Sequence, residues 1–536
     1  MGKKAGDLLS DKFGTEVKVG RINIGLFNRV IVDDVRMKDQ SGQEMIRASR
    51  LSTTIDFIPL FNGKISISSA QLFGLQGTFY KKDALSKPNF QFALDSLASK
   101  DTTRHTPLDL HIGTIVVRHS GFTYDRLDIP RTNGKFNPNH LNVKNISTHL
   151  LLPQITDDRI EATLKRLSLE EASGLKLKDL SFKLRADKKQ TTLTQLKVIL
   201  PQTKLTIDSI GASYEMQDGK IEMATLQYAG RISESKITPA DLAFLDRQLS
   251  TFEHSLHLKS SFSGTGSMLQ LHQLNLESDE GELKLDANGS ISANKRWFAN
   301  INQLQLSAHT IAFLEQNLQG KNIQIPKELV RLGNIAFRGE AGGADKDVSL
   351  KGILDTDAGN ANLGLGLHQN RFSARIETDG INLQRILDDK KFGQLASQID
   401  IDGDTNLKSI KAVGNVSRFD YNDYSYRNID IDGDLQSSLF NGHLSIDDPN
   451  AQIDLDGDLD ISSNNPKAKL VAKVRNLVPS ALKLTNRFGD ARFAMNVDAN
   501  VTGKSLATVL GTVNITDFEM HSQQQNYHLD HLILNS

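Results

Sequence analysis

Hydrophobic residues alternate with polar ones along most of this 536-residue chain, and that period of two constrains the fold more than any other feature. In residues 283–291, for example, Leu283 and Leu285 fall on one side while Lys284 and Asp286 fall on the other. Successive side chains of a β-strand point to opposite faces of its sheet. The alternation therefore predicts strands that each have one apolar and one polar face.

The segments between these strands are short and rich in turn-forming residues. The pairs Asp218-Gly219 and Asn441-Gly442 favour tight hairpins. A parallel sheet needs crossover connections of a dozen or more residues, and most gaps here are shorter. We therefore predict a mainly β fold, in which an elongated, twisted antiparallel sheet is curled into an open groove and punctuated by short helices.

Helical spacing is confined to a few short segments. We expect a leading helix at 3–13 and helical segments near the following residues: 239–250, 311–319, 326–332, 383–391 and 479–486. The segments starting at Pro239, Ile311 and Leu383 are spaced by 72 residues (311 − 239 and 383 − 311). Regular spacing of this kind indicates repeated units that share one core. We divide the chain into an N-terminal β-groove segment, 1–235, and repeated helix-plus-strand units, 236–536.

Composition excludes several classes of function. Lys and Arg number 63 against 64 Asp and Glu, so the net charge of −1 gives no overall field for nucleic acid, and we expect no nucleic-acid partner. The absence of cysteine excludes disulfides, thiolate metal sites and a cysteine nucleophile. No apolar run reaches the ~18–20 residues of a membrane-spanning helix. The chain also starts without a signal peptide and stops within a predicted strand, so we expect a fragment of a longer protein.

The most conspicuous polar pattern is a repeat of alternate aspartates, such as Asp400, Asp402 and Asp404. A calcium-binding EF-hand loop needs a differently placed glycine and a glutamate that is missing here. Alternation explains the pattern more simply, as the polar face of a strand. The 14 histidines are scattered, and no catalytic motif is present. We predict no catalytic residues, no metal site and no cofactor, and we expect that the protein is not an enzyme.

Strands with one apolar face need a cover for that face. A second sheet would make a sandwich, closure would make a barrel, and curling would leave an open groove. Helices are too few to cover the sheet, and an open lining this long would exceed the few hundred Å² of apolar patch that a soluble monomer exposes. We therefore predict a groove for an apolar ligand. Its candidate lining residues are Leu283, Leu285, Ile291, Ile399, Ile401, Ile429, Ile431, Ile453, Leu455, Leu470, Val474, Phe493, Met495 and Val497. The alternative is that they form the ordinary core of a closed sandwich.

Several segments carry a family resemblance. The opening residues 8–22, 28–35 and 63–67, together with residues 419–421, 426–429 and 442–450, resemble the translocation and assembly module (TamB) family and, more broadly, the AsmA-like superfamily. Two departures are the lack of an N-terminal anchor helix and of a recognisable C-terminal TamB domain. The resemblance implies a repeating β-groove of the bridge-like lipid transfer type, and it implies that the chain is an N-terminal periplasmic fragment.

The same resemblance implies a role in outer-membrane biogenesis. The expected function is a periplasm-spanning conduit or scaffold that carries phospholipid acyl chains along the groove. Expected partners are phospholipid, an Omp85-type outer-membrane barrel protein (TamA-like or BamA-like), and the inner membrane through the missing anchor. The expected location is the periplasm. Two alternatives stay open, namely a chaperone-like scaffold for outer-membrane β-barrel assembly or secretion and a surface β-repeat adhesin.

Overall fold

The computed structural model describes residues 2–25, 28–56, 66–97, 111–132, 134–156, 158–252, 254–318, 325–460, 466–503 and 510–535. The chain divides into two compact units, Met1–Gly281 and Glu282–Ser536. The boundary expected at residue 235 falls within a strand of the first unit, Gln227–Ile237.

The first unit is built mainly from strands. They are β1 (Val17–Gly25), β2 (Arg29–Lys38), β3 (Glu44–Asp56), β4 (Ser66–Phe73), β5 (Gln76–Lys81), β6 (His111–Ile112), β7 (Thr114–Arg126), β8 (His140–Ile155), β9 (Arg159–Glu171), β10 (Lys176–Asp187), β11 (Gln190–Ile199), β12 (Lys204–Ser213), β13 (Met216–Gln217), β14 (Lys220–Ile221), β15 (Gln227–Ile237), β16 (Leu256–Thr265) and β17 (Met268–Ser278). The helices are α1 (Gly2–Phe13), α3 (Gln91–Leu97) and two 3-10 turns, η1 (Pro239–Leu242) and η2 (Arg247–Thr251).

Most neighbouring strands of this unit pair antiparallel, as the short turns predict. The exception is β7, which runs parallel to β4 and β5, while β6 runs parallel to β4. The long connection from β5 to β7 returns the chain to the same end of the sheet, which a tight hairpin cannot do. A buried cluster of Val17, Val19, Met37 and Met45 lies where α1 packs on β1.

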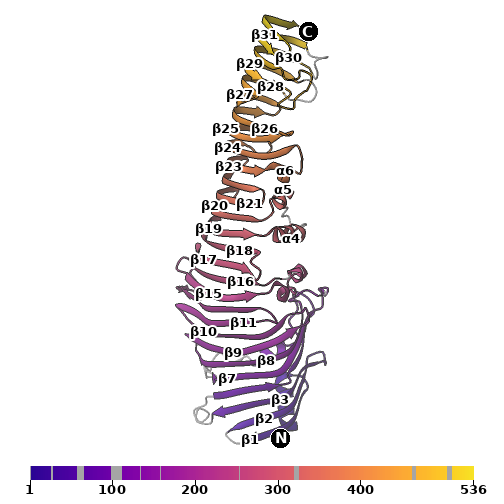
Figure 1. The fold of residues 1–536 in the computed structure, drawn as a ribbon. Coiled ribbons are helices and arrows are strands. Elements are labelled where there is room, and N and C mark those ends of the chain that lie inside the picture. The colour runs from indigo at the N-terminus through magenta and orange to yellow at the C-terminus, as the bar shows by residue number, and fades with distance from the viewer. Residues whose placement is uncertain are drawn as a thin grey trace. The chain divides into compact units, whose positions relative to one another are not determined.

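The second unit is a more regular meander. Its strands are β18 (Leu283–Ser292), β19 (Arg296–Leu306), β20 (Ile335–Ala344), β21 (Asp347–Thr356), β22 (Gly359–His368), β23 (Arg371–Asn382), β24 (Phe392–Asp404), β25 (Ser409–Tyr421), β26 (Tyr424–Gln436), β27 (Leu439–Asp448), β28 (Ala451–Asp460), β29 (Lys467–Leu477), β30 (Arg492–Thr502), β31 (Leu510–His521) and β32 (Asn526–Asn535). Its helices are α4 (Ala308–Leu318), α5 (Lys327–Arg331) and α6 (Leu383–Leu387), and Figure 1 shows them gathered at one end of the strands.

The predicted fold class is confirmed, because the chain is mainly a curved antiparallel β-sheet with few short helices. One expected helix is wrong. Residues 479–486 form turns, in which Leu482 N–H donates to Val478 O but Leu484 N–H donates to Pro479 O, so no regular helical ladder develops. Lys483 has a φ of 60°, which interrupts a right-handed helix within the segment, and Thr485 and Asn486 favour turns over helix.

The chain leaves much of its surface open to solvent. Its accessible area is 33023 Å². A compact globular protein of 59.2 kDa exposes about 19,000 Å², and two separate globules of half that mass expose about 23,000 Å² in total. The excess shows that much of the sheet surface lacks the cover that a second protein layer gives in ordinary β-sandwiches.

Small residues allow neighbouring backbones to approach closely on the apolar face. Gly339 and Gly352 lie directly opposite each other on β20 and β21, and a Cβ at Gly352 would clash with Arg338 O, the Phe337 ring and the Gly339 Cα. On β24, the Phe372 ring occupies the space where a Gly403 side chain would lie. Glycine kinks covered by a cross-strand aromatic ring are a known means of curving a sheet.

This close packing predicts a contrast between two glycines. Gly352→Ala should destabilise the second unit by about 1–3 kcal/mol, because the added methyl meets backbone atoms that cannot move aside. A Cβ at Gly364 would meet only Arg375 Cβ, at 3.7 Å. Gly364→Ala should therefore be neutral or stabilising by about 0.4–1 kcal/mol. Urea midpoints of the two variants test this, and an equal loss of stability in both would contradict the role of close approach.

Candidate functional site

The candidate site is the apolar face of the sheet, and in the second unit it begins with one central row of side chains. Each member lies directly opposite the next on the neighbouring strand, from β18 to β32. The row is Ala287, Ile301, Gly339, Gly352, Leu363, Ile376, Ile399, Gly414, Ile431, Leu444, Leu455, Ala472, Val497, Ile515 and Leu532. Every member is apolar or glycine, so fifteen consecutive strands present an uninterrupted apolar line.

A second row follows the ends of the strands that are joined by tight turns. We call the ends that carry this row the hairpin rim. The opposite ends, where α4, α5 and α6 connect some of the strands and short turns connect others, are the helix rim. The hairpin-rim row is Ile291, Trp297, Gly343, Val348, Leu367, Phe372, Gly403, Ile410, Leu435, Phe440, Leu459, Ala468 and Val501. It too contains only apolar residues and glycine.

The first unit has the same organisation. One of its rows crosses from β1 to β12 by way of β7 and is apolar except for a single threonine. Its members are Ile22, Val32, Leu51, Leu72, Val117, Thr148, Leu167, Leu180, Val198 and Leu205. The sequence prediction placed no lining residue in this unit, although the same alternation is visible there.

The opposite face of the second unit carries the charges. Arg375 Nε pairs with Asp400 Oδ1 at 2.5 Å across β23 and β24, and His443 Nδ1 lies 2.9 Å from Asp456 Oδ1 across β27 and β28. The repeated aspartates thus lie on the polar face, as alternation predicts. Within the described residues, no group of three potential metal-ligating side chains is close enough to hold an ion.

All fourteen predicted lining residues lie on the apolar face of the second unit. Ile399, Ile431, Leu455 and Val497 belong to the central row and Ile291 to the hairpin-rim row. Eleven of the fourteen are half-buried, Ile291 is exposed, and Val474 and Phe493 are buried. A closed sandwich core would bury side chains of this size almost completely, so an open face fits them better. Their contact with a ligand stays a prediction.

Side-chain exposure changes across the apolar face, which the sequence pattern did not reveal. Near the helix rim, Phe337 and Ala361 are 6% and 3% exposed. Near the hairpin rim, Ile291, Val348 and Leu367 are 48%, 43% and 37% exposed. The helix-rim half is therefore the more buried one, and the hairpin-rim half is an apolar surface in contact with solvent.

Several connections at the helix rim contribute to this difference, because they bury an apolar side chain there. Ile311 of α4, Leu332 after α5 and Leu482 in the turns at 479–486 are all buried. Hydrogen bonds also tie α5 to α6. Arg331 Nη1 donates to Ile386 O at 3.1 Å, and Arg385 Nε donates to Arg331 O at 2.8 Å. The helix rim of β20–β23 is thereby held together by side chains from segments more than fifty residues apart.

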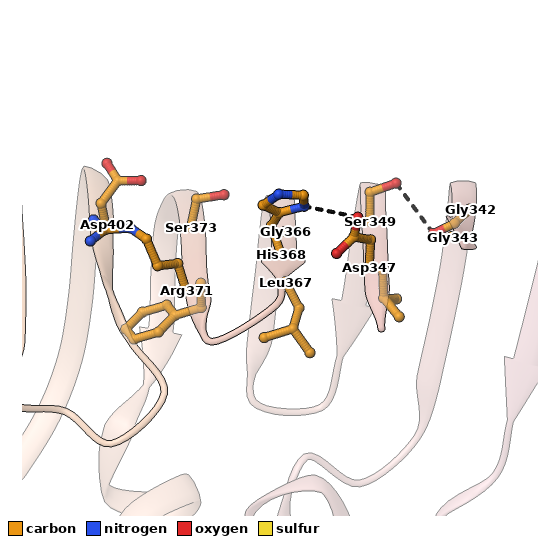
Figure 2. A pocket seen from close by; sticks show the side chains of 12 residues that line it. Gly342, Gly343, Asp347, Ser349, Gly366, Leu367, His368, Arg371, Ser373 and Asp402 are labelled. Atoms are coloured by element: carbon orange, nitrogen blue, oxygen red, sulfur yellow. Dashed lines mark hydrogen bonds and ion pairs between the residues drawn. The ribbon is translucent and has the colours of Figure 1, made fainter. Parts of the chain in front are cut away.

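Figure 2 shows the hairpin rim of β20–β24 from close by. Leu367 points to one side of the sheet, whereas Ser349, Ser373 and Asp402 point to the other. These residues line a hollow of about 450 Å³ at the strand ends. In the same view, His368 Nδ1 contacts Asp347 Oδ2 at 2.9 Å, so the adjoining turns carry charged groups beside apolar ones.

The first unit contains a buried, ionised carboxyl group. Asp39, in the turn between β2 and β3, is 2% exposed. Burial by itself would raise its pKa, but hydrogen bonds from Ser41, the backbone of Gln43, Tyr80 Oη (3.0 Å) and Asn89 Nδ2 (3.3 Å) outweigh burial and lower the pKa. The Asp39 carboxylate therefore joins the β2–β3 turn to Tyr80 on β5 and to Asn89.

Comparisons with protein-family models, with curated proteins and with solved structures found no match. No helix in the described segments is both long and apolar enough to cross a membrane.

The hydrogen bonds of Asp39 predict how stability depends on pH. Because folding lowers its pKa below that of an unfolded aspartate (~3.9), its contribution is present above about pH 4 and is lost as pH falls through the folded pKa. Asp39→Asn should cost about 1–3 kcal/mol at pH 7 and flatten the acid limb of stability, because its buried partners lose the charged acceptor.

Urea unfolding between pH 2 and 7 measures this effect. Asp218→Asn is the matched control, because Asp218 is exposed in a turn at a φ of 51°, which asparagine also tolerates. Identical pH profiles for Asp39→Asn and the control would show that the carboxylate does not hold the turn.

Proposed function

We propose that this protein is a non-enzymatic lipid conduit or scaffold, in which the apolar face of the sheet holds phospholipid acyl chains. The carrying observation is the set of uncharged rows that pass without interruption from strand to strand. Each CH₂ group removed from water gains about 0.8 kcal/mol, so an acyl chain gains free energy at every position along a row. Movement from one strand to the next exchanges one apolar contact for another and needs no chemical step.

The solvent exposure of the hairpin rim favours an amphiphilic ligand over a wholly apolar one. Along the hairpin rim, exposed aliphatic side chains border turns that carry charged residues. A headgroup is costly to dehydrate, and at this rim it can stay in water while its acyl chains lie on the apolar face. A ligand without a polar group would gain nothing from an open rim.

The wider biological role rests on the sequence resemblance to the TamB family and the AsmA-like superfamily. On that basis we propose a role in outer-membrane biogenesis and a location in the periplasm, with anchorage in the inner membrane. The proposed partners are phospholipid and an Omp85-type outer-membrane barrel protein. The apolar rows are compatible with this role, because a bridge between membranes needs a continuous path for acyl chains.

A chaperone-like scaffold for outer-membrane β-proteins is the second candidate. The exposed apolar side chains of the hairpin rim, such as Ile291, Val348 and Leu367, favour it. An unfolded barrel segment also carries apolar side chains that such a surface can contact. This candidate predicts binding of unfolded barrel segments in preference to phospholipid.

Lipid retention is the direct test of the conduit. Leu435→Asp with Leu459→Asp places two charges on the hairpin-rim row and should abolish co-purified phospholipid in native mass spectrometry, because a charge is strongly disfavoured beside an acyl chain. The matched control is Val413→Asp with Val471→Asp, since both valines are exposed on the polar face.

The control should retain lipid, and both double variants should keep the β-rich circular dichroism of the parent. Unfolding of the first double variant alone would indicate a closed core and would contradict the groove. Absence of lipid from the unaltered protein would also contradict the conduit.

A further inference from the structure

Resting on the proposed function, we infer that phospholipid lies along the hairpin rim of β18–β23, with its acyl chain over the row Ile291, Trp297, Gly343, Val348, Leu367 and Phe372 and with a preference for a headgroup of net negative charge. The helix rim of the same strands is more buried and is bordered by the helical connections, so we place no ligand there. The argument has three parts, which concern exposure, the nature of the row, and charge.

The first part is access. On β21, Val348 at the hairpin rim is 43% exposed, while Phe337 on the neighbouring β20 is 6% exposed at the helix rim. Arg385 strengthens the closure of the helix rim by contacting Asp357 Oδ2 at 3.2 Å while also donating to Arg331 O. A ligand that came to the helix rim would have to displace these contacts, whereas the hairpin rim is already in contact with solvent.

The second part is the shape of the row. Gly343 has no side chain, and the Trp297 indole lies above it, with Nε1 3.0 Å from where a Cβ would lie. Val348 and Leu367 continue the row on the next two strands. The result is a line of aliphatic and aromatic carbon that crosses the strands at the width of one side chain, which suits a linear acyl chain.

The third part is charge at the adjoining turns. The turns joining β18–β19, β20–β21 and β22–β23 carry four cations against two acids. The cations are Lys295, Arg296, Lys346 and Arg371, and the acids are Asp345 and Asp347. Asp347 is already paired with His368. The net charge of these turns is therefore +2 (4 − 2), with the histidine counted as neutral, and it complements a phosphate-bearing headgroup of net charge −1.

The neighbouring turns differ, which confines the charge preference to this part of the rim. Around the β24–β25 turn, Asp402 and Asp404 balance Lys408 and Lys411, and the end of β26 carries Asp434. The apolar row continues past these strands, but the excess of cations does not. We therefore assign headgroup selection to the turns of β18–β23. The rest of the row would contact only acyl chains.

Trp297 is the protein's single tryptophan and lies in the proposed contact row, so it reports binding directly. The full chain is titrated with phosphatidylglycerol vesicles whose acyl chains carry bromine, and with matched brominated phosphatidylcholine vesicles. We expect quenching of Trp297 by both lipids, with tighter binding of phosphatidylglycerol. Trp297→Phe with Phe298→Trp moves the indole to the other face one residue along, where Phe298 is exposed, and should lose the quenching.

Two pairs of variants separate the acyl chain from the headgroup. Val348→Asp with Leu367→Asp should abolish quenching by both lipids, whereas Ile353→Asp, an exposed position on the polar face of the same strand β21, should leave it intact. Lys295→Glu with Lys346→Glu should weaken phosphatidylglycerol binding by about fivefold or more for each cation and leave phosphatidylcholine binding unchanged.

The outcomes distinguish this inference from the function on which it rests. Equal quenching of Trp297 and of the relocated tryptophan, or quenching that survives Val348→Asp with Leu367→Asp, would overturn the hairpin-rim assignment. Equal affinity for the two lipids would overturn the headgroup preference. Phospholipid found by native mass spectrometry together with an unquenched Trp297 would overturn this inference alone, whereas a protein without any lipid would overturn the conduit as well.

Discussion

The in-register antiparallel ladder is the constraint on which the rest of the structure depends. Because side chains alternate between faces, a residue on the apolar face of one strand must lie beside a residue on the apolar face of the next. A slip of one residue between β26 and β27 would set Ile431 against a polar neighbour in place of Leu444. The apolar rows and the charged opposite face are therefore two consequences of one register.

Curvature and closure come from departures from that regular pattern. Where Gly339 meets Gly352, and where Phe372 covers Gly403, the backbone approaches more closely than side chains would allow. At the helix rim, short helical connections bury apolar side chains and hydrogen-bond one another over long sequence separations. The same apolar face is consequently more buried along one rim and more exposed along the other, an arrangement that suits the proposed conduit for amphiphiles.

Much of this arrangement could be predicted from local pattern. The mainly β, antiparallel fold follows from alternation and turn residues, and all fourteen predicted lining residues share one face for the same reason. The prediction failed where local signals were ambiguous. Pro479 suggested the start of a helix at 479–486, but the left-handed Lys483 and the turn-forming residues after it limit that segment to turns. The parallel pairing of β7 with β4 and β5 was also missed, because it depends on a long connection whose path no local pattern specifies.

The sequence by itself determined which side chains share a face, since alternation with a period of two residues is a property of each single strand. It also determined that the apolar face carries aliphatic residues and glycine and that the aspartate repeats belong to the polar face. Only the tertiary structure decided which part of the apolar face is open. Exposure depends on where α4, α5, α6 and Leu482 pack, and on hydrogen bonds such as that between Arg331 and Ile386, which join residues far apart in the chain. Alternation is the same at both rims, so it cannot distinguish a covered leucine from one that faces solvent.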